Sequence, residues 1–161
     1  MPISTSSPLL QRRHLLTGLV GAALWPATSW AHGAPVPPLI EVWKSPACGC
    51  CNDWIAHLKA NGFRVKSYDT GNAPMRAELG MPPKLASCHT AKIEDYVIEG
   101  HVPAREIHRL LKEQPTAIGL SMPGMPLASS CMDGEAFDHK TEPYNVLLVL
   151  RDGATRVFQA Y

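Results

Sequence analysis

The feature that most constrains the fold is a cysteine-rich turn between two elements of different periodicity. Residues 39–44 form a β-branched, partly alternating run typical of a strand, and the turn Cys48–Cys51, with the sequence CGCC, comes soon after it. Apolar positions from Asn52 to Asn61 then recur at helical spacing, and Phe63–Tyr68 is again strand-like. Strand, turn, helix and strand within about thirty residues predict a βαβ unit, and therefore a parallel strand pair with a right-handed crossover.

The second half of the chain predicts antiparallel hairpins and one more helix. Residues 85–93 and 96–99 are two short strand-like runs, and apolar positions over 103–114 follow helical spacing. The last runs, 144–150 and 156–160, surround an Asp-Gly pair, which is a strong hairpin signal. The sheet should therefore be mixed, with parallel and antiparallel neighbours.

Two stretches between these elements are less regular. A short helical stretch is expected around 75–79, whereas residues 116–143 show neither helical nor strand periodicity and predict a long loop that carries methionine and cysteine. We expect one α/β domain over 39–161, with a central mixed sheet, flanking helices and this loop. The C-x-x-C spacing of Cys48 and Cys51 after a strand of a βαβ unit indicates a thioredoxin-like fold.

The cysteine turn is the strongest candidate for chemistry. The spacing of Cys48 and Cys51 places both sulfur atoms on one face of a first helical turn, close enough to form a disulfide or to hold one metal ion. Unpaired N–H groups and the positive end of the helix dipole favour thiolates there, so we expect lowered thiol pKa values. Metal binding and redox chemistry are the two functions that follow, and a structural disulfide without function is the plain alternative.

Cys50 favours the metal-binding interpretation. A third thiol one residue away would scramble the disulfides of a simple redox enzyme, whereas bridging thiolates suit a soft ion such as copper(I), including a multinuclear cluster. Zinc is the competing metal, because Cys88 and His89 could supply a second ligand pair for a tetrahedral site. We expect copper rather than zinc, since three sulfurs on one tight turn fit poorly at three corners of a tetrahedron.

Further soft ligands lie outside the turn. Cys88 and His89 begin the predicted hairpin and should face the cysteine turn, and His101 should return to the same end of the sheet. Met122 and Met125 place two thioethers, which select copper(I), on a proline-stiffened loop. Each also has a structural explanation: a buried cysteine, surface histidines and methionines that fill gaps in the core.

Cys131, next to Met132, is the fifth cysteine of the chain. It could extend the soft surface or pair with Cys88, and the sequence does not choose between these roles. Because five is an odd number, at least one thiol must be free, metal-bound or paired with another molecule.

Composition and the first residues indicate an exported, single-domain protein. The chain has 161 residues, with 15 Lys and Arg against 14 Asp and Glu, so it offers no basic surface for nucleic acid. Arg12 and Arg13 precede an apolar stretch over 15–25, which is too short to span a bilayer. We expect residues 1–31 to be a signal peptide, twin-arginine in type rather than general secretory, and the mature protein to be periplasmic without a membrane attachment.

These motifs together resemble the CopG-type periplasmic copper-resistance family. The resemblance covers most of the chain from Leu39 onward and rests on Cys48–Cys51, Ser87–Thr90, Tyr96–Pro103, Pro123–Pro126 and Glu142–Tyr144. It implies a thioredoxin-like domain that binds a copper cluster through its cysteine-rich turn, associated with copper-efflux and copper-tolerance systems and suspected of copper-linked redox activity. Cys48, Cys50 and Cys51 would be copper ligands, with Cys88 and the nearby histidines as candidates.

Two functions from different classes follow from the sequence. The first is a periplasmic copper-binding protein of copper resistance, holding copper(I) and meeting copper-efflux or chaperone proteins. The second is a periplasmic thiol–disulfide oxidoreductase acting on proteins.

Overall fold

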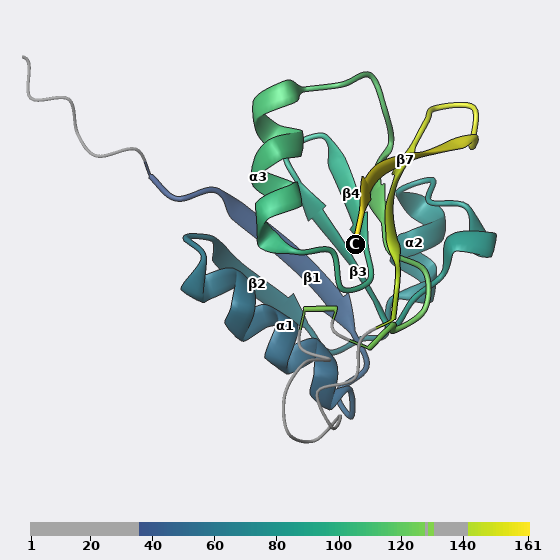
Figure 1. The fold of residues 1–161 in the computed structure, drawn as a ribbon. Coiled ribbons are helices and arrows are strands. Elements are labelled where there is room, and N and C mark those ends of the chain that lie inside the picture. Colours follow the sequence, from purple (N-terminus) through teal and green to yellow (C-terminus); the bar gives the residue numbers. More distant parts are fainter. Residues whose placement is uncertain (1–35, 128, 131–141) are drawn as a thin grey trace, which may run out of the picture. The chain divides into compact units, whose positions relative to one another are not determined.

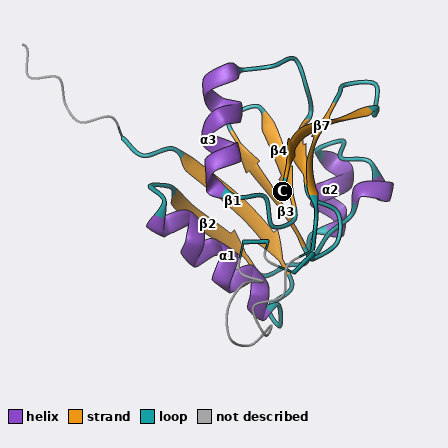
Figure 2. Ribbon diagram, in the orientation of Figure 1, coloured by secondary structure: helices purple, strands orange, loops and turns teal. Residues whose placement is uncertain are grey.

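The computed structural model describes residues 36–127, 129–130 and 142–161. Within them, three α-helices and one short 3-10 helix accompany seven strands (Figures 1 and 2). In chain order the elements are β1 (Leu39–Lys44), α1 (Gly49–Ala60), β2 (Arg64–Tyr68), α2 (Ala73–Glu78), the 3-10 helix η1 (Pro83–Leu85), β3 (His89–Ile93), β4 (Tyr96–Glu99), α3 (Ala104–Glu113), β5 (Gly119–Ser121), β6 (Asn145–Val149) and β7 (Thr155–Ala160).

The strands form one mixed sheet in the order β2-β1-β3-β4-β5-β6-β7. β1 is parallel to β2 and antiparallel to β3, and β3 is antiparallel to β4. β5 then pairs in parallel with β4, and β6 and β7 continue the sheet with antiparallel pairs. The predicted α/β class, mixed sheet, βαβ unit and both hairpins are confirmed, and the assignment to the thioredoxin-like class stays a prediction.

The core lies on both faces of this sheet, because side chains alternate along each strand. The larger cluster contains Ile40, Val42 and Ile98 from the strands, Trp54 and Leu58 from α1, and inward residues of α3. The smaller cluster places Val97 and Val149 against Met81 and Leu85, which lie between α2 and β3. Thus α1 and α3 share one face of the sheet, and the segment between α2 and β3 packs on the other.

Three boundaries differ from the sequence predictions. Helix α1 begins at Gly49 rather than Asn52, which brings Cys50 and Cys51 into its first turn. β3 begins only at His89, because Pro83–Leu85 forms the 3-10 helix. The stretch 116–143 was expected to be a loop without strands, but it contains β5, which lies between β4 and β6 in the sheet.

The predicted signal peptide, residues 1–31, lies outside the described residues. In the part of the chain that the structure describes, none of the helices has the length and apolar character needed to cross a membrane.

Candidate metal centre

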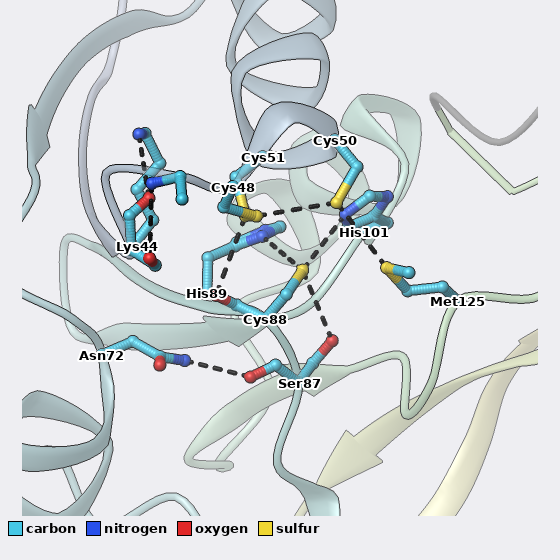
Figure 3. Close-up of a disulfide and its surroundings, with 12 residues drawn as sticks. Lys44, Cys48, Cys50, Cys51, Asn72, Ser87, Cys88, His89, His101 and Met125 are labelled. Carbon is cyan, nitrogen blue, oxygen red and sulfur yellow. Dashed lines mark hydrogen bonds between the residues drawn. A yellow bond between two sulfur atoms is a disulfide. The ribbon is translucent and has the colours of Figure 1, made fainter.

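The sheet topology gathers the chemically reactive residues at one edge. β1, β4 and β5 run in the same direction, so their carboxyl ends meet there, and antiparallel β3 brings its amino end to the same place. β1 leads into Cys48, β3 begins at His89 directly after Cys88, and β4 is followed by His101. Figure 3 shows these side chains converging on one another from the separate segments. The prediction that Cys88 and His89 face the cysteine turn is therefore consistent with the structure.

The sulfur atoms form one compact group. The Sγ atoms of Cys48, Cys50, Cys51 and Cys88 all lie within 4.8 Å of one another. Cys50 Sγ is 3.6 Å from Cys48 Sγ and also 3.6 Å from the thioether sulfur of Met125. Five sulfur atoms thus meet at the sheet edge, and they come from α1 and its N-cap residue Cys48, the segment before β3 and the loop after β5.

Cys48 and Cys51 are joined by a disulfide (Figure 3). The C-x-x-C spacing allowed either a disulfide or a shared metal ion, and the structure shows the disulfide, whereas the copper-ligand interpretation requires both sulfurs to be unbridged. Cys50 and Cys88 are the free thiols among the described cysteines. The observed state is therefore the oxidised one, and reduction of the Cys48–Cys51 bond is needed before the turn can offer three thiolates.

Cys88 lies between two imidazole rings. Its Sγ is 3.3 Å from Nδ1 of His89 and 3.3 Å from Nε2 of His101. Both histidines are fully buried, and their ring centroids are 5.2 Å apart. The indole of Trp54 packs against the His89 ring at 4.2 Å and donates a hydrogen bond to the carbonyl oxygen of Val102. Sequence alone did not separate buried ligands from surface histidines here, and the structure shows that both rings are buried.

Burial keeps these groups uncharged. Desolvation, with a contribution from nearby Cys50, raises the pKa of the Cys88 thiol to about 11. Desolvation, assisted by His101, lowers the pKa of His89 to about 3, and burial also lowers the pKa of His101 against the opposing hydrogen bond to Ser130. At neutral pH the metal-free centre therefore holds a thiol and two neutral imidazoles.

The hydrogen bonds of His101 set its tautomer. Its Nδ1 lies 3.0 Å from the carbonyl oxygen of Ser130, which can only accept, so Nδ1 carries the proton. The lone pair of Nε2 is thus directed at Cys88 Sγ. A histidine whose outer nitrogen donates to a carbonyl is the usual arrangement of a metal ligand.

Comparisons with known proteins identify the family. A solved structure titled "Copper resistance protein copG- Form 2" is 37% identical, with a TM-score of 0.71, and the match covers 78% of this chain and 98% of that chain. A second, titled "Copper resistance protein copG- Form 1", is 38% identical with a TM-score of 0.69 and the same coverage. The chain belongs to the CopG family. This confirms the resemblance found in the sequence.

Two further comparisons complete this result. A family described as "Protein of unknown function, DUF411" matches residues 85–132, the stretch of this CopG-family chain that includes Cys88, His89 and His101. No curated protein matches the chain.

The donors of this CopG-family centre suit a soft metal ion. Thiolate and thioether sulfur favour copper(I), and neutral imidazole also binds copper. One geometric observation fits an ion directly: Cys88 Sγ and one ring nitrogen each from His89 and His101 lie within 4.8 Å of one another, and Nδ1 is the His89 nitrogen that faces Cys88, at 3.3 Å. One thiol and two neutral imidazoles this close together suit a single soft metal ion.

The two candidate methionines separate clearly. Met125 is 46% exposed and contacts Cys50, so it belongs to the sulfur group. Met122 is fully buried in the larger core cluster, where its role is packing. The site described here therefore includes Met125 and omits Met122. Cys131 lies outside the described residues.

Sequence reasoning missed two charged residues that border the centre. Lys44, at the end of β1, is 3% exposed and forms an ion pair of 2.6 Å with Asp69. Glu99, at the end of β4, is fully buried and bonded to the segment that contains Cys88. Both stand at strand ends on the site edge, and that position was the signal available in the sequence.

Proposed function

We propose that this protein binds copper(I) through its sulfur group and acts in copper resistance. The observation that carries the proposal is the convergence of four cysteine sulfurs within 4.8 Å, in a chain that is 37% identical to a copper resistance protein CopG. Cys48, Cys50, Cys51 and Cys88 supply thiolates, Met125 supplies a thioether, and His89 and His101 supply imidazole nitrogen. Thiolates can bridge neighbouring ions, so this donor set supports a multinuclear site.

The disulfide adds a redox function to the same centre. When the reduced Cys48 and Cys51 form their disulfide, they release two electrons and two protons, which are enough to reduce two copper(II) ions to copper(I). The reverse reaction consumes two electrons from copper(I) or another donor. Copper binding and thiol oxidation therefore draw on the same sulfur atoms, and the reduced protein is the copper-binding form.

The remaining parts of the proposal concern location and partners. Residues 1–31 act as an export signal, and the mature protein works in the periplasm. Copper-efflux or copper-chaperone proteins receive or deliver the ion. The exposed side of the sulfur group, where Met125 contacts Cys50, is the accessible route for such a transfer.

Copper stoichiometry tests the proposal. The fully reduced mature chain, loaded under anaerobic conditions, should bind more than one copper(I) per molecule, whereas the chain with the Cys48–Cys51 disulfide should bind fewer. Cys50→Ser should lower the stoichiometry of the reduced chain. Asn52→Ser, on the same turn of α1 but without sulfur, is the matched control and should leave it unchanged. A count unaffected by loss of Cys50 would remove the cluster from the proposal.

A thiol–disulfide oxidoreductase is the second candidate, and the observed Cys48–Cys51 disulfide favours it. This function predicts that the metal-free protein reduces or oxidises a model protein disulfide at rates comparable with thioredoxin-type enzymes, and that copper only inhibits the reaction. If thiol–disulfide exchange is slow and each chain binds several copper(I) ions, the copper-binding function is supported instead.

A further inference from the structure

A buried carboxylate holds the backbone next to the centre. Glu99 has no exposed side-chain surface. Its Oε1 accepts hydrogen bonds from the backbone N–H of Ser87 at 2.7 Å and from Nε of Arg76 at 2.9 Å, and its Oε2 accepts from the hydroxyl of Thr90 at 2.6 Å. One carboxylate therefore binds both ends of the segment Ser87–Thr90. The two inner residues of that segment are Cys88 and His89.

Helix α2 completes this arrangement from the other side. Nη2 of Arg76 donates to the carbonyl oxygen of Ser87 at 2.9 Å, so Arg76 bridges Glu99 and the segment. Nδ2 of Asn72 donates to the same carbonyl oxygen at 3.1 Å and contacts the hydroxyl oxygen of Thr90 at 3.3 Å. None of the side chains of α2 is buried. The hydrogen bonds of Asn72 and Arg76, rather than apolar packing, therefore attach the start of the helix to the sheet.

The position of Glu99 also links the segment to His101. The N–H of Gly100 donates to the carbonyl oxygen of His89 at 3.1 Å, and His101 follows directly. A Cβ on Gly100 would lie 2.7 Å from the Ser87 hydroxyl oxygen and 2.5 Å from the carbonyl oxygen of Met122, so the chain segments touch here. A shift at Glu99 would therefore move Cys88, His89 and His101 relative to one another.

A contribution to the overall stability of the fold does not by itself explain why Glu99 and Arg76 form a buried ion pair. A buried ion pair often stabilises a fold no more than an apolar pair of the same size, because both charges lose their hydration. However, a buried network in which every polar group has a hydrogen-bond partner holds the local structure in one geometry. In this chain that place is the backbone on each side of Cys88 and His89.

We infer that Glu99, together with Arg76, is a positioning residue that holds the Cys88 thiol against the two imidazoles and toward the cysteine turn. What the positioned residues then bind rests on the proposed copper function, but the positioning itself does not. Glu99 acts through the backbone N–H of Ser87 and the side-chain hydroxyl of Thr90, and it needs no contact with the metal.

The first test uses metal-free protein with the Cys48–Cys51 disulfide intact. Alkylation of Cys88 is measured by peptide mass spectrometry against Cys50 in the same molecules. Glu99→Gln should raise the Cys88 rate relative to Cys50 about tenfold, because charged hydrogen bonds to both ends of its segment are lost. Glu106→Gln is the matched control: Glu106 is 1% exposed and paired with Arg105 and Arg109, but it lies on α3.

The second test measures copper(I) affinity of the reduced chain. Glu99→Gln should weaken it about 10- to 100-fold, the usual effect of losing a group that orients metal ligands, while Glu106→Gln should leave it unchanged. Arg76→Lys keeps the charge but loses the contacts with both Glu99 and Ser87. It should also raise the Cys88 alkylation rate and weaken copper(I) binding, and it replaces Glu99→Gln in both tests if that variant does not fold.

The outcomes are distinct. An unchanged Cys88 rate in both Glu99→Gln and Arg76→Lys, or equal effects of the Glu99 and Glu106 variants, would overturn the positioning role. A faster Cys88 rate with no copper binding by the wild-type chain would support the positioning role and refute the proposed function instead.

Discussion

At the scale of single residues, the centre is defined by which sulfur and nitrogen atoms are brought together rather than by which are present. Met122 and Met125 lie three residues apart and carry the same side chain, yet one is in the core and the other contacts Cys50. Their sequence context gave both equal standing as copper ligands. Met122 directly follows Ser121, the last residue of β5, and its N–H donates to the carbonyl oxygen of Glu99, so it stays beside the sheet, whereas Met125 lies further along the loop.

Substitution of the two methionines tests this assignment. Met125→Leu removes the thioether beside Cys50 and should weaken copper(I) binding, measured by competition with a chromophoric copper(I) chelator, while its exposed position leaves stability unchanged. Met122→Leu is the control and should keep the copper affinity, with a change in the free energy of unfolding below about 1.5 kcal/mol. If Met122→Leu weakened copper binding more than Met125→Leu, the assignment would be wrong.

At the scale of elements, the sequence predicted what depends on local periodicity. The parallel pair β1–β2 and the hairpins β3–β4 and β6–β7 follow from alternation and turn residues near in sequence. β5 could not be predicted in this way, because its three residues begin with a glycine and follow an irregular stretch. Its place is fixed by pairing with β4, which is distant along the chain.

Gly119 shows why that strand is sensitive to substitution. A Cβ on Gly119 would lie 1.8 Å from the carbonyl oxygen of Val97, a backbone atom of the paired strand that cannot turn aside. Gly119→Ala should therefore lower the free energy of unfolding by about 3 kcal/mol or more, measured by urea denaturation. Gly49→Ala, where no atom lies within 4 Å, is the control and should be neutral or slightly stabilising. Similar losses for both variants would contradict the close approach of β4 and β5.

At the scale of the described domain, the sequence predicted most of the residues that meet, with Met122 as an exception, but not their chemical state. The motifs around Cys48–Cys51, Cys88 and His101 indicated one shared centre, because the ends of neighbouring strands bring them together. Whether Cys48 and Cys51 are thiols or a disulfide depends on redox conditions, which no residue pattern encodes. The supporting role of Glu99 was also hidden, since its partners Arg76 and Ser87 come from separate segments of the chain.

The C-terminal residue joins the far strand of the sheet to α3 and gives the domain a pH-dependent contact. The hydroxyl of Tyr161 donates to Oε1 of Glu106 at 3.0 Å, and Nη2 of Arg105 donates to the same hydroxyl oxygen at 3.0 Å. Burial, assisted by Glu106, raises the pKa of Tyr161 to about 12, from an ordinary value of 10.0. The folded chain thus retains a proton that the unfolded chain loses first.

This proton predicts a loss of stability at alkaline pH. The contribution of Tyr161 is fully present below pH 10, where the phenol is neutral in both states, and it is lost as the pH rises from about 10 to about 12. Free energies of unfolding from urea denaturation at pH 9 and pH 11 should fall more for the wild-type chain than for Tyr161→Phe, which has no phenol to titrate. Lysine titration affects both chains equally, so the difference between the two decreases isolates Tyr161. Equal decreases would show that the contact between Tyr161 and Glu106 does not contribute to stability in solution.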